Sequence, residues 1–152
     1  MITEIQGDLI ELANQGYFDV IVHGCNCQST MKAGIAPQMA AAFNCDNYKM
    51  ELQGPSITKL GNIDYEVVNN TFVVNAYTQL RYGKNHPDGD KAPFDYEAFT
   101  ICMRKINSLF FSKHIGMPKI GAGLAGGDRK RIKQIIEECL VDCNVTIVNY
   151  NK

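Results

Sequence analysis

Apolar and β-branched residues gather in short runs along the chain, and these runs predict its strands. Phe18–His23 is almost unbroken in its apolar character, which is typical of a strand buried on both faces. Ile63–Val68 and Thr71–Tyr77 are β-branched runs joined by Asn69-Asn70. Because asparagine tolerates positive φ, this pair predicts a hairpin with a type I′ turn. Further strands are predicted over Ile2–Gln6, over Ile115–Ile120 with an interruption at Pro118, and over Val145–Tyr150.

Between these runs, apolar residues recur at helical spacing. Asp8 is a good N-cap for a short helix, and Pro37 suits the first turn of an alanine-rich helix over Ala36–Phe43. A helix from about Phe94 to Phe110 is predicted to present one apolar face, made of Ala98, Ile101, Cys102 and Leu109. A last helix begins at Asp128 and carries a stripe of Ile132, Ile135, Ile136, Cys139 and Leu140.

The alternation of strands and amphipathic helices predicts the fold class. We expect an α/β fold, a three-layer α/β/α sandwich with a central mixed sheet. Residues 1–152 suit a single domain, since domains average roughly 150 residues. Ligands of such folds bind at the carboxyl ends of strands, where loops enter helices. The polar segment Arg81–Ala92 is predicted to be a surface loop.

Composition and charge narrow the possible functions. Hydrophobic residues are 45% and charged residues 20%, which excludes a disordered chain. The formal charge of -1 excludes a protein that binds duplex nucleic acid through contacts to its phosphate backbone. The sequence has no apolar run near the roughly 20 residues that span a bilayer. Since Met1–Asp8 also lacks the pattern of a secretory signal, we expect a cytoplasmic protein without membrane contact.

The six cysteines predict reduced thiols, most of them small core residues. A zinc site built from Cys25, Cys27 and one histidine remains an alternative, although no pair has the spacing of a zinc finger. The histidine of such a site would be His23, His86 or His114. We expect no metal and no cofactor.

Two glycine-containing segments each leave a predicted strand and enter a predicted helix. They are His23–Ala36 and Lys119–Asp128. Glycine lets backbone N–H groups approach an anion closely, and the following helix adds its positive end. Neither a GxGxxG fingerprint nor a Gly-Lys-Ser/Thr string is present, so a dinucleotide Rossmann domain or a P-loop enzyme is not supported. Two such loops facing each other would hold a diphosphate from both sides.

Four motifs in this order resemble those of a macrodomain, the α/β/α module that binds ADP-ribose. They are Gly7-Asp8-Leu9, Val22-His23-Gly24-Cys25-Asn26, Gly34-Ile35-Ala36 and Ile120-Gly121-Ala122-Gly123-Leu124-Ala125-Gly126-Gly127. The resemblance covers essentially the whole chain. Within that family, the chain resembles the small single-domain branch, which includes ADP-ribose-1″-phosphate phosphatases and terminal ADP-ribose glycohydrolases. The string that ends at Asp128 also resembles macrodomain proteins of large tailed phages, which implies a host-cytoplasmic location.

The resemblance implies a binding role for several residues. Asp8, beside Leu9, would accept a hydrogen bond from the adenine amino group, and this role is compatible with its N-cap. Asn26 would contact the distal ribose, or else only form a turn. Tyr150 would pack on adenine, or else be an ordinary surface tyrosine. Lys32 would lie near a terminal phosphate. The diphosphate loops would be Gly34, Ile35 and Ala36, and Gly121, Ala122, Gly123, Leu124, Ala125, Gly126 and Gly127.

Candidate catalysts are His23, Asp128 and Asn26. A histidine is the natural general acid or base near neutral pH, but His23 is equally well read as hydrogen-bonded within the sheet. Asp128 would orient water, or only cap the last helix. The glycohydrolase branch has an aspartate where this chain has Ala125. That branch also uses a lysine nucleophile, and neither Lys49 nor Lys59 aligns with it.

The resemblance therefore implies a hydrolase that binds ADP-ribose and converts ADP-ribose-1″-phosphate to ADP-ribose and phosphate. One alternative is an ADP-ribosyl hydrolase that acts on ADP-ribosylated protein or nucleobases. Another is a binding module for ADP-ribose without turnover. A third, outside the family, is an unrelated nucleotide-binding α/β protein.

Overall fold

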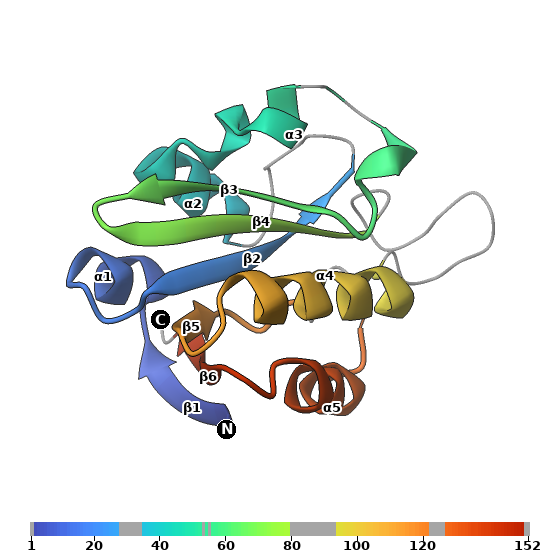
Figure 1. Ribbon diagram of the computed structural model, residues 1–152. Coiled ribbons are helices and arrows are strands. Elements are labelled where there is room, and N and C mark those ends of the chain that lie inside the picture. The colour runs from blue at the N-terminus through green and yellow to red at the C-terminus, as the bar shows by residue number, and fades with distance from the viewer. Residues whose placement is uncertain are drawn as a thin grey trace.

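A computed structural model describes residues 2–27, 35–52, 54, 56–79, 94–121 and 127–150. The strands of this part form a six-stranded sheet in the order β1-β6-β5-β2-β4-β3 (Figure 1). Only the β3–β4 pair is antiparallel, so the sheet is mixed, as predicted. The strands are β1 (Ile2–Gly7), β2 (Val20–Asn26), β3 (Ile63–Val68), β4 (Thr71–Gln79), β5 (His114–Met117) and β6 (Asn144–Tyr150).

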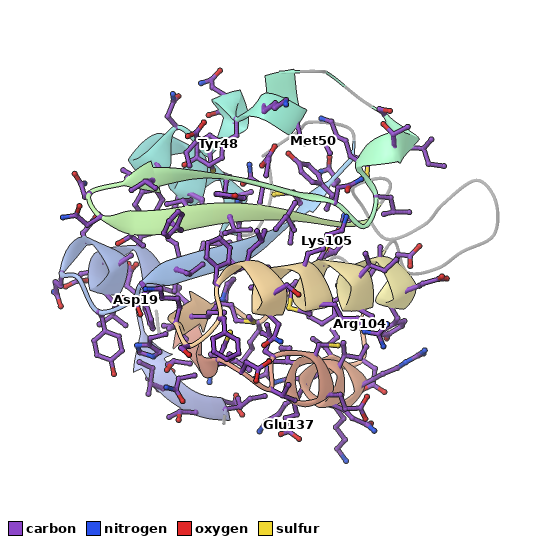
Figure 2. The ribbon with its side chains drawn as sticks, in the orientation of Figure 1. Asp19, Tyr48, Met50, Arg104, Lys105 and Glu137 are labelled. Atoms are coloured by element: carbon purple, nitrogen blue, oxygen red, sulfur yellow. The ribbon has the colours of Figure 1, made fainter. Side chains whose placement is uncertain are left out.

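Helices cover both faces of the sheet and confirm the α/β/α arrangement. On one face lie α1 (Leu9–Asn14) and α2 (Ala36–Phe43), and on the other α4 (Tyr96–Leu109) and α5 (Arg129–Cys139). The short α3 (Lys49–Leu52) follows α2. Figure 2 shows Tyr48 and Met50 on one side of the β3–β4 hairpin, and Arg104 and Lys105 of α4 on the other.

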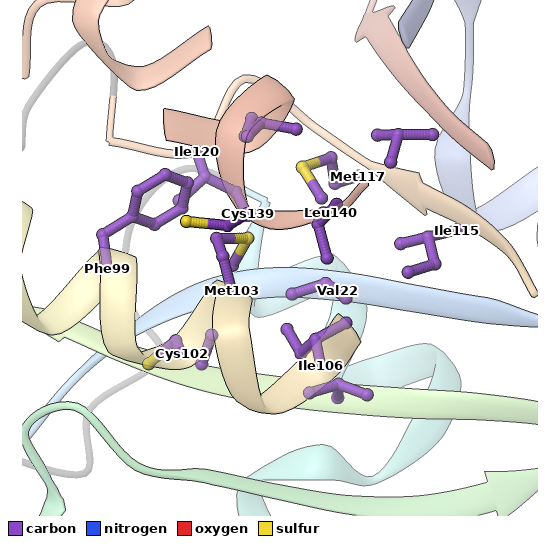
Figure 3. Close-up of a cluster of buried hydrophobic side chains, with 14 of the residues drawn as sticks. Val22, Phe99, Cys102, Met103, Ile106, Ile115, Met117, Ile120, Cys139 and Leu140 are labelled. Carbon is purple, nitrogen blue, oxygen red and sulfur yellow. The ribbon is translucent and has the colours of Figure 1, made fainter. Parts of the chain in front are cut away.

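The central strand β2 is buried on both faces, as its apolar run predicts. Val20 and Val22 pack with α4 and α5, whereas Ile21 packs with α1 and α2. Each of these side chains is fully buried, and burial of one such side chain stabilises the fold by about 1.5–3 kcal/mol. Figure 3 shows the first of these clusters, with Met103 and Leu140 between α4 and α5.

Local turn and cap signals are confirmed. Asn69 and Asn70 have φ of 51° and 66°, the positive values that a type I′ hairpin turn needs. Pro37 lies in the first turn of α2, whose bounds are those predicted. The predicted Arg81–Ala92 loop lies outside the described residues.

Three predictions about the elements are wrong. The second strand begins at Val20 and continues to Asn26, so His23 does not end it. On α4, Ile101 and Leu109 are 40% and 54% exposed. The buried face of α4 instead consists of Ala98, Phe99, Cys102, Met103 and Ile106. The strand over Ile115–Ile120, predicted to be interrupted by Pro118, is indeed interrupted there, but it spans His114–Met117 and does not resume after the proline, which has no N–H for the ladder.

All six cysteines fall within the described residues, and each is buried and free of disulfides, as expected. Among the helices of the described part, none is long and apolar enough to cross a membrane.

Candidate functional site

A cleft of about 380 Å³ lies where β1, β5 and β6 end. These strands are parallel neighbours, so their carboxyl ends meet at one edge of the sheet, the edge at which such folds bind ligands. The volume lies within the range of small-molecule sites. Its lining residues are Asp8, Leu9, Ile10, Ile35, Gln38, Pro118, Lys119, Val148, Asn149 and Tyr150.

Asp8 stands at the junction between β1 and α1, in the wall of this cleft. Its extended backbone lets the side chain turn back onto the helix, and its Oδ1 accepts a hydrogen bond of 3.1 Å from the Glu11 N–H. One oxygen therefore serves the cap. The second carboxylate oxygen, Oδ2, accepts no hydrogen bond from the described residues. The cap and a ligand contact are thus compatible at this residue.

Tyr150 ends β6 opposite Gly7 of β1, and it also lines the cleft. The side chain is 67% exposed, although β6 lies inside the sheet between β1 and β5. An exposed ring at the edge of a cleft offers a flat face on which a planar ligand can stack. Asp8, Leu9, Ile35 and Tyr150, which the sequence singled out, are thus brought together.

The cleft also contains residues that sequence reasoning missed, namely Ile10, Gln38, Pro118, Lys119, Val148 and Asn149. The Oδ1 atom of Asn149 is buried and has no hydrogen-bond partner among the described residues. Lys119, which follows β5, adds an exposed positive charge to the lining. A signal for these residues was present, because Lys119 and Asn149 lie directly beside predicted strand ends.

His23 lies within β2 and is fully buried. Its Nε2 is 2.6 Å from Oδ1 of Asn75, and since that oxygen only accepts, Nε2–H is the donor. The Asn75 Nδ2 in turn donates a hydrogen bond of 2.9 Å to the carbonyl of Cys45. Burial disfavours the charged imidazolium and lowers the pKa of His23 to about 4. These contacts favour the reading of His23 as a histidine hydrogen-bonded within the sheet.

Asn26 is the last residue of β2 and is largely buried. The strand end is held on both sides, because the Cys27 N–H donates to the carbonyl of Gln79 and the Ser56 N–H donates to that of Cys27. In the strand order, β5 lies between β2 and β6. Asn26 is therefore at the same edge of the sheet as the cleft, displaced along it.

Asp128 is exposed and caps α5, where its Oδ1 accepts a hydrogen bond of 2.9 Å from the Lys130 N–H. The backbone N–H of Asp128 donates to Oη of Tyr96 at 2.7 Å. Asp128 thus has the cap role predicted for it. Its role in chemistry remains a prediction.

The two ends of the second glycine loop are described, and the Gly127 N–H donates to the carbonyl of Gly121 at 2.7 Å. Of the first loop, Ile35 and Ala36 are described. The residues Lys32 and Gly34 of the first loop, and Ala122, Gly123, Leu124, Ala125 and Gly126 of the second, lie outside the described residues.

Lys59 is fully buried, and its Nζ lies 5.4 Å from the centre of the Tyr77 ring. Lys49 lies at the start of α3. In the described part of the chain, histidine, cysteine and acidic residues form no group of three or more suited to holding a metal ion. His86, one option for the zinc alternative, lies outside that part.

Comparison with known proteins gives one related sequence and several similar structures. The chain matches no family model. The uncharacterized 17.5 kDa protein in the tk-vs intergenic region of Enterobacteria phage T4 is 31% identical over 156 residues, which cover 96% of this chain and 94% of that protein.

Among solved structures, a protein from Bacteroides thetaiotaomicron is 26% identical, with a TM-score of 0.82 over 98% of this chain and 99% of the other. The macrodomain of Thermus aquaticus DarG is 22% identical, with a TM-score of 0.72 over 100% and 99%. Thermosipho africanus DarTG in complex with ADP-ribose is 13% identical, with a TM-score of 0.75 over 97% of this chain and 41% of the other. These similarities extend over nearly the whole chain.

Proposed function

Because this chain is a macrodomain and belongs to the family of the phage T4 17.5 kDa protein, we propose that it binds ADP-ribose, with the adenosine in the cleft between Asp8 and Tyr150. The ADP-ribose in the similar DarTG structure supports this ligand class. The observation that carries the proposal is the cleft itself. It combines one carboxylate oxygen of Asp8 that the described residues leave without a donor and an exposed ring of Tyr150.

These two groups match the chemistry of adenine. Its exocyclic amino group donates hydrogen bonds, and the unused oxygen of Asp8 accepts them. Its planar ring stacks on an aromatic face such as that of Tyr150. The sequence predicted both contacts through its resemblance to macrodomains, and here they are proposed as functional contacts.

The pyrophosphate would lie next to the amino end of α2. Ile35, the N-cap residue of α2, lines the same cleft as Asp8. The side chain of the N-cap residue, Ile35, makes no cap hydrogen bond, and the amino end of a helix favours an anion. By contrast, α5 is capped by the Asp128 side chain. We therefore assign the main helix-terminus contact to α2, and we assign the facing contacts to the loop between Gly121 and Gly127.

We further propose that the substrate is ADP-ribose-1″-phosphate and that Asn26 positions its distal ribose at the end of β2. Water would attack phosphorus, the bond between phosphorus and the O1″ oxygen would break, and that oxygen would take up a proton. Rate acceleration would come from positioning and from hydrogen bonds to the phosphate. His23 would support β2 instead of transferring a proton, because it is buried and its pKa of about 4 keeps it neutral.

Binding is tested by calorimetric titration with ADP-ribose of the wild type, Asp8→Asn and the control Asp46→Asn, an exposed acid outside the cleft lining. Asparagine caps a helix as well as aspartate does. With its single side-chain oxygen on the Glu11 N–H, the introduced asparagine would present an amide NH₂ group to the adenine amino group. We expect affinity to fall at least tenfold, which is about 1.4 kcal/mol, with no change in Tm. Equal affinity in both variants would refute the adenine contact.

Turnover is tested separately on three substrates. Phosphate release from ADP-ribose-1″-phosphate supports the phosphatase. Release of label from ADP-ribosylated protein or DNA, without phosphate release, supports the ADP-ribosyl hydrolase. Binding without either activity supports a module that only binds. Absence of any heat or thermal shift with ADP-ribose would refute the proposed function as a whole.

A further inference from the structure

We propose that the open edge of β3, together with the neighbouring stripe of α4, is a docking surface for an extended peptide that adds a strand to the sheet. β3 is the last strand in the sheet order, whereas the proposed adenosine cleft lies where β1, β5 and β6 end (Figure 1). The docking surface is therefore separate from the cleft, and the inference does not depend on the proposed function.

The first observation concerns the backbone groups along this edge. Val68 and Thr71 close the two-residue turn of the β3–β4 hairpin and so share backbone hydrogen bonds, and bonded pairs alternate along an antiparallel ladder. The N–H and C=O groups of Ile63, Tyr65 and Val67 therefore point away from β4. Among the described residues, none of these groups has a hydrogen-bond partner. A second extended backbone would supply donors and acceptors at the matching spacing.

The second observation is that β3 lacks the features by which many edge strands avoid pairing. Over Ile63–Val68 it contains no lysine and no proline, and it pairs with β4 in one continuous register without a bulge. Two of its large apolar side chains, Tyr65 and Val67, are 40% and 57% exposed. An edge of this kind is a template on which another chain can pair.

The third observation is that α4 continues the apolar surface beside this edge. Tyr65 and Val67 point to the face of the sheet that α4 covers, since side chains alternate along a strand and the Tyr65 ring meets that of Phe110 edge-on at 5.4 Å. An open groove runs along α4 and is lined by Ile101, Arg104, Lys105, Ser108 and Leu109. Its two apolar residues are exposed. Apolar side chains of an added strand would therefore pack between β3 and α4.

The acidic residues of β3 oppose pairing with a second copy of the chain. Asp64 and Glu66 lie on the face of β3 opposite to that of Tyr65. In an antiparallel pair of two β3 strands centred on Tyr65, Asp64 would lie opposite the partner subunit's Glu66. In a pair centred on Glu66, two glutamates would face each other. Like charges directly opposite one another destabilise a strand pair, so the edge favours a partner with a basic side chain beside Glu66.

Lys105 gives the surface a positive charge at the other end of the strand. Its Nζ donates a hydrogen bond of 2.6 Å to Oδ1 of Asn62, directly before β3, and it lies on the α4 side of the hairpin (Figure 2). No acidic side chain in the described ranges forms an ion pair with it. A peptide antiparallel to β3 would bring its carboxyl end to this ammonium group. The partner is thus an extended segment in which apolar and basic residues alternate before an acidic end.

The probe is a fluorescently labelled peptide of alternating valine and lysine that ends in aspartate, and its affinity for the full chain is measured by anisotropy. With the valines toward α4, the valine amides face β3 and the lysine amides face solvent. A peptide N-methylated on its valines is therefore expected to bind about tenfold more weakly or worse, whereas one N-methylated on its lysines keeps its affinity. Binding should also slow hydrogen exchange at the amides of Tyr65 and Val67.

The protein variant is Val67→Lys, which places at the open edge the residue type that protects natural edge strands. Thr3→Lys is the matched control, because Thr3 is exposed on β1, the edge strand at the other side of the sheet. Peptide affinity is expected to fall about tenfold or more in Val67→Lys and to stay unchanged in Thr3→Lys. The affinity of both variants for ADP-ribose should equal that of the wild type.

Several results would overturn the proposal. The wild type could fail to bind the peptide at concentrations up to about 1 mM, or the two methylated peptides could bind equally well, which would exclude backbone pairing. Unchanged peptide affinity in Val67→Lys would exclude this edge. If size-exclusion chromatography shows a wild-type dimer and a Val67→Lys monomer, the occupant is a second copy and not a peptide. Should Val67→Lys fail to fold, the methylated peptides decide the matter with the wild type alone. None of these results bears on ADP-ribose binding, so the proposed function would stand.

Discussion

The buried His23 predicts a loss of stability in mild acid that can be worked out from its surroundings. Its imidazole has a pKa of about 4 in the folded protein, against an ordinary value of 6.5, because burial disfavours the charged form. Below pH 6.5 the unfolded chain takes up a proton that the folded chain cannot accept. The contribution of His23 to the free energy of unfolding is therefore fully present above pH 6.5, and it is lost as the pH falls toward 4.

The magnitude follows from the two pKa values. A fall from 6.5 to about 4 corresponds to roughly 3 kcal/mol, since each pKa unit is about 1.4 kcal/mol. This is a large share of the 5–15 kcal/mol by which domains are typically stable. Burial raises the pKa of Asp64, which acts in the opposite sense, and the pKa of Glu4 is lowered by its hydrogen bond with Lys133. Asp64 and Glu4 are present in both the wild type and a His23 variant. Their effects on the free energy of unfolding therefore cancel when the two proteins are compared at the same pH.

The assay is urea unfolding of the wild type and His23→Gln between pH 4 and 7.5. Glutamine cannot take up the proton, yet its amide can still donate to Oδ1 of Asn75. At pH 7.5 the variant is expected to be less stable than the wild type, because it packs less well. The advantage of the wild type should shrink by about 3 kcal/mol as the pH falls to 4. If the difference in unfolding free energy between the wild type and His23→Gln stays constant with pH, the reasoning is refuted. His23 would then again be a candidate proton donor.

Two further predictions concern the core. Tyr77→Phe removes the 2.9 Å hydrogen bond from Oη to Oδ2 of Asp64 and should cost about 1–2 kcal/mol in urea unfolding, against less than about 0.5 kcal/mol for Tyr65→Phe; equal losses in the two variants would mean that this bond adds nothing. Met103→Ala, at a fully buried position, should cost about 2–5 kcal/mol, whereas Leu109→Ala on the exposed face of α4 should cost under about 0.5 kcal/mol. The reverse order would show that the buried face of α4 is assigned wrongly.

The parts of the fold that the sequence predicts are those decided by nearby residues. The paired asparagines set their turn through their own φ angles, and Asp8 caps the helix that begins directly after it. The face of α4 was predicted wrongly because its apolar residues fit more than one helical stripe. Which stripe is buried depends on α5 and the sheet, so Met103 and Ile106 are buried and Ile101 is not.

In the candidate site, too, some features are set by nearby residues and others by contacts between distant parts of the chain. Asp8 and Tyr150 belong to motifs that can be read from the sequence, and both line the cleft. The buried hydrogen bond of His23 is made with Asn75, which is 52 residues away on a neighbouring strand. Lys119 and Asn149 line the cleft because β5 and β6 are neighbours, a pairing that no local pattern specifies.

The two helices that begin at this edge of the sheet have different local chemistry, and this difference bears on how the ligand would be held. The N-cap side chain of α2, that of Ile35, makes no cap hydrogen bond, and Ile35 lines the cleft. The amino end of α5 is closed by Asp128, whose own N–H is taken by Tyr96. A carboxylate that caps a helix already places negative charge at its amino end, so such an end attracts a further anion less than one whose N-cap side chain is apolar. In the proposed complex the pyrophosphate would therefore lie at the amino end of α2, beside Ile35, rather than at the amino end of α5.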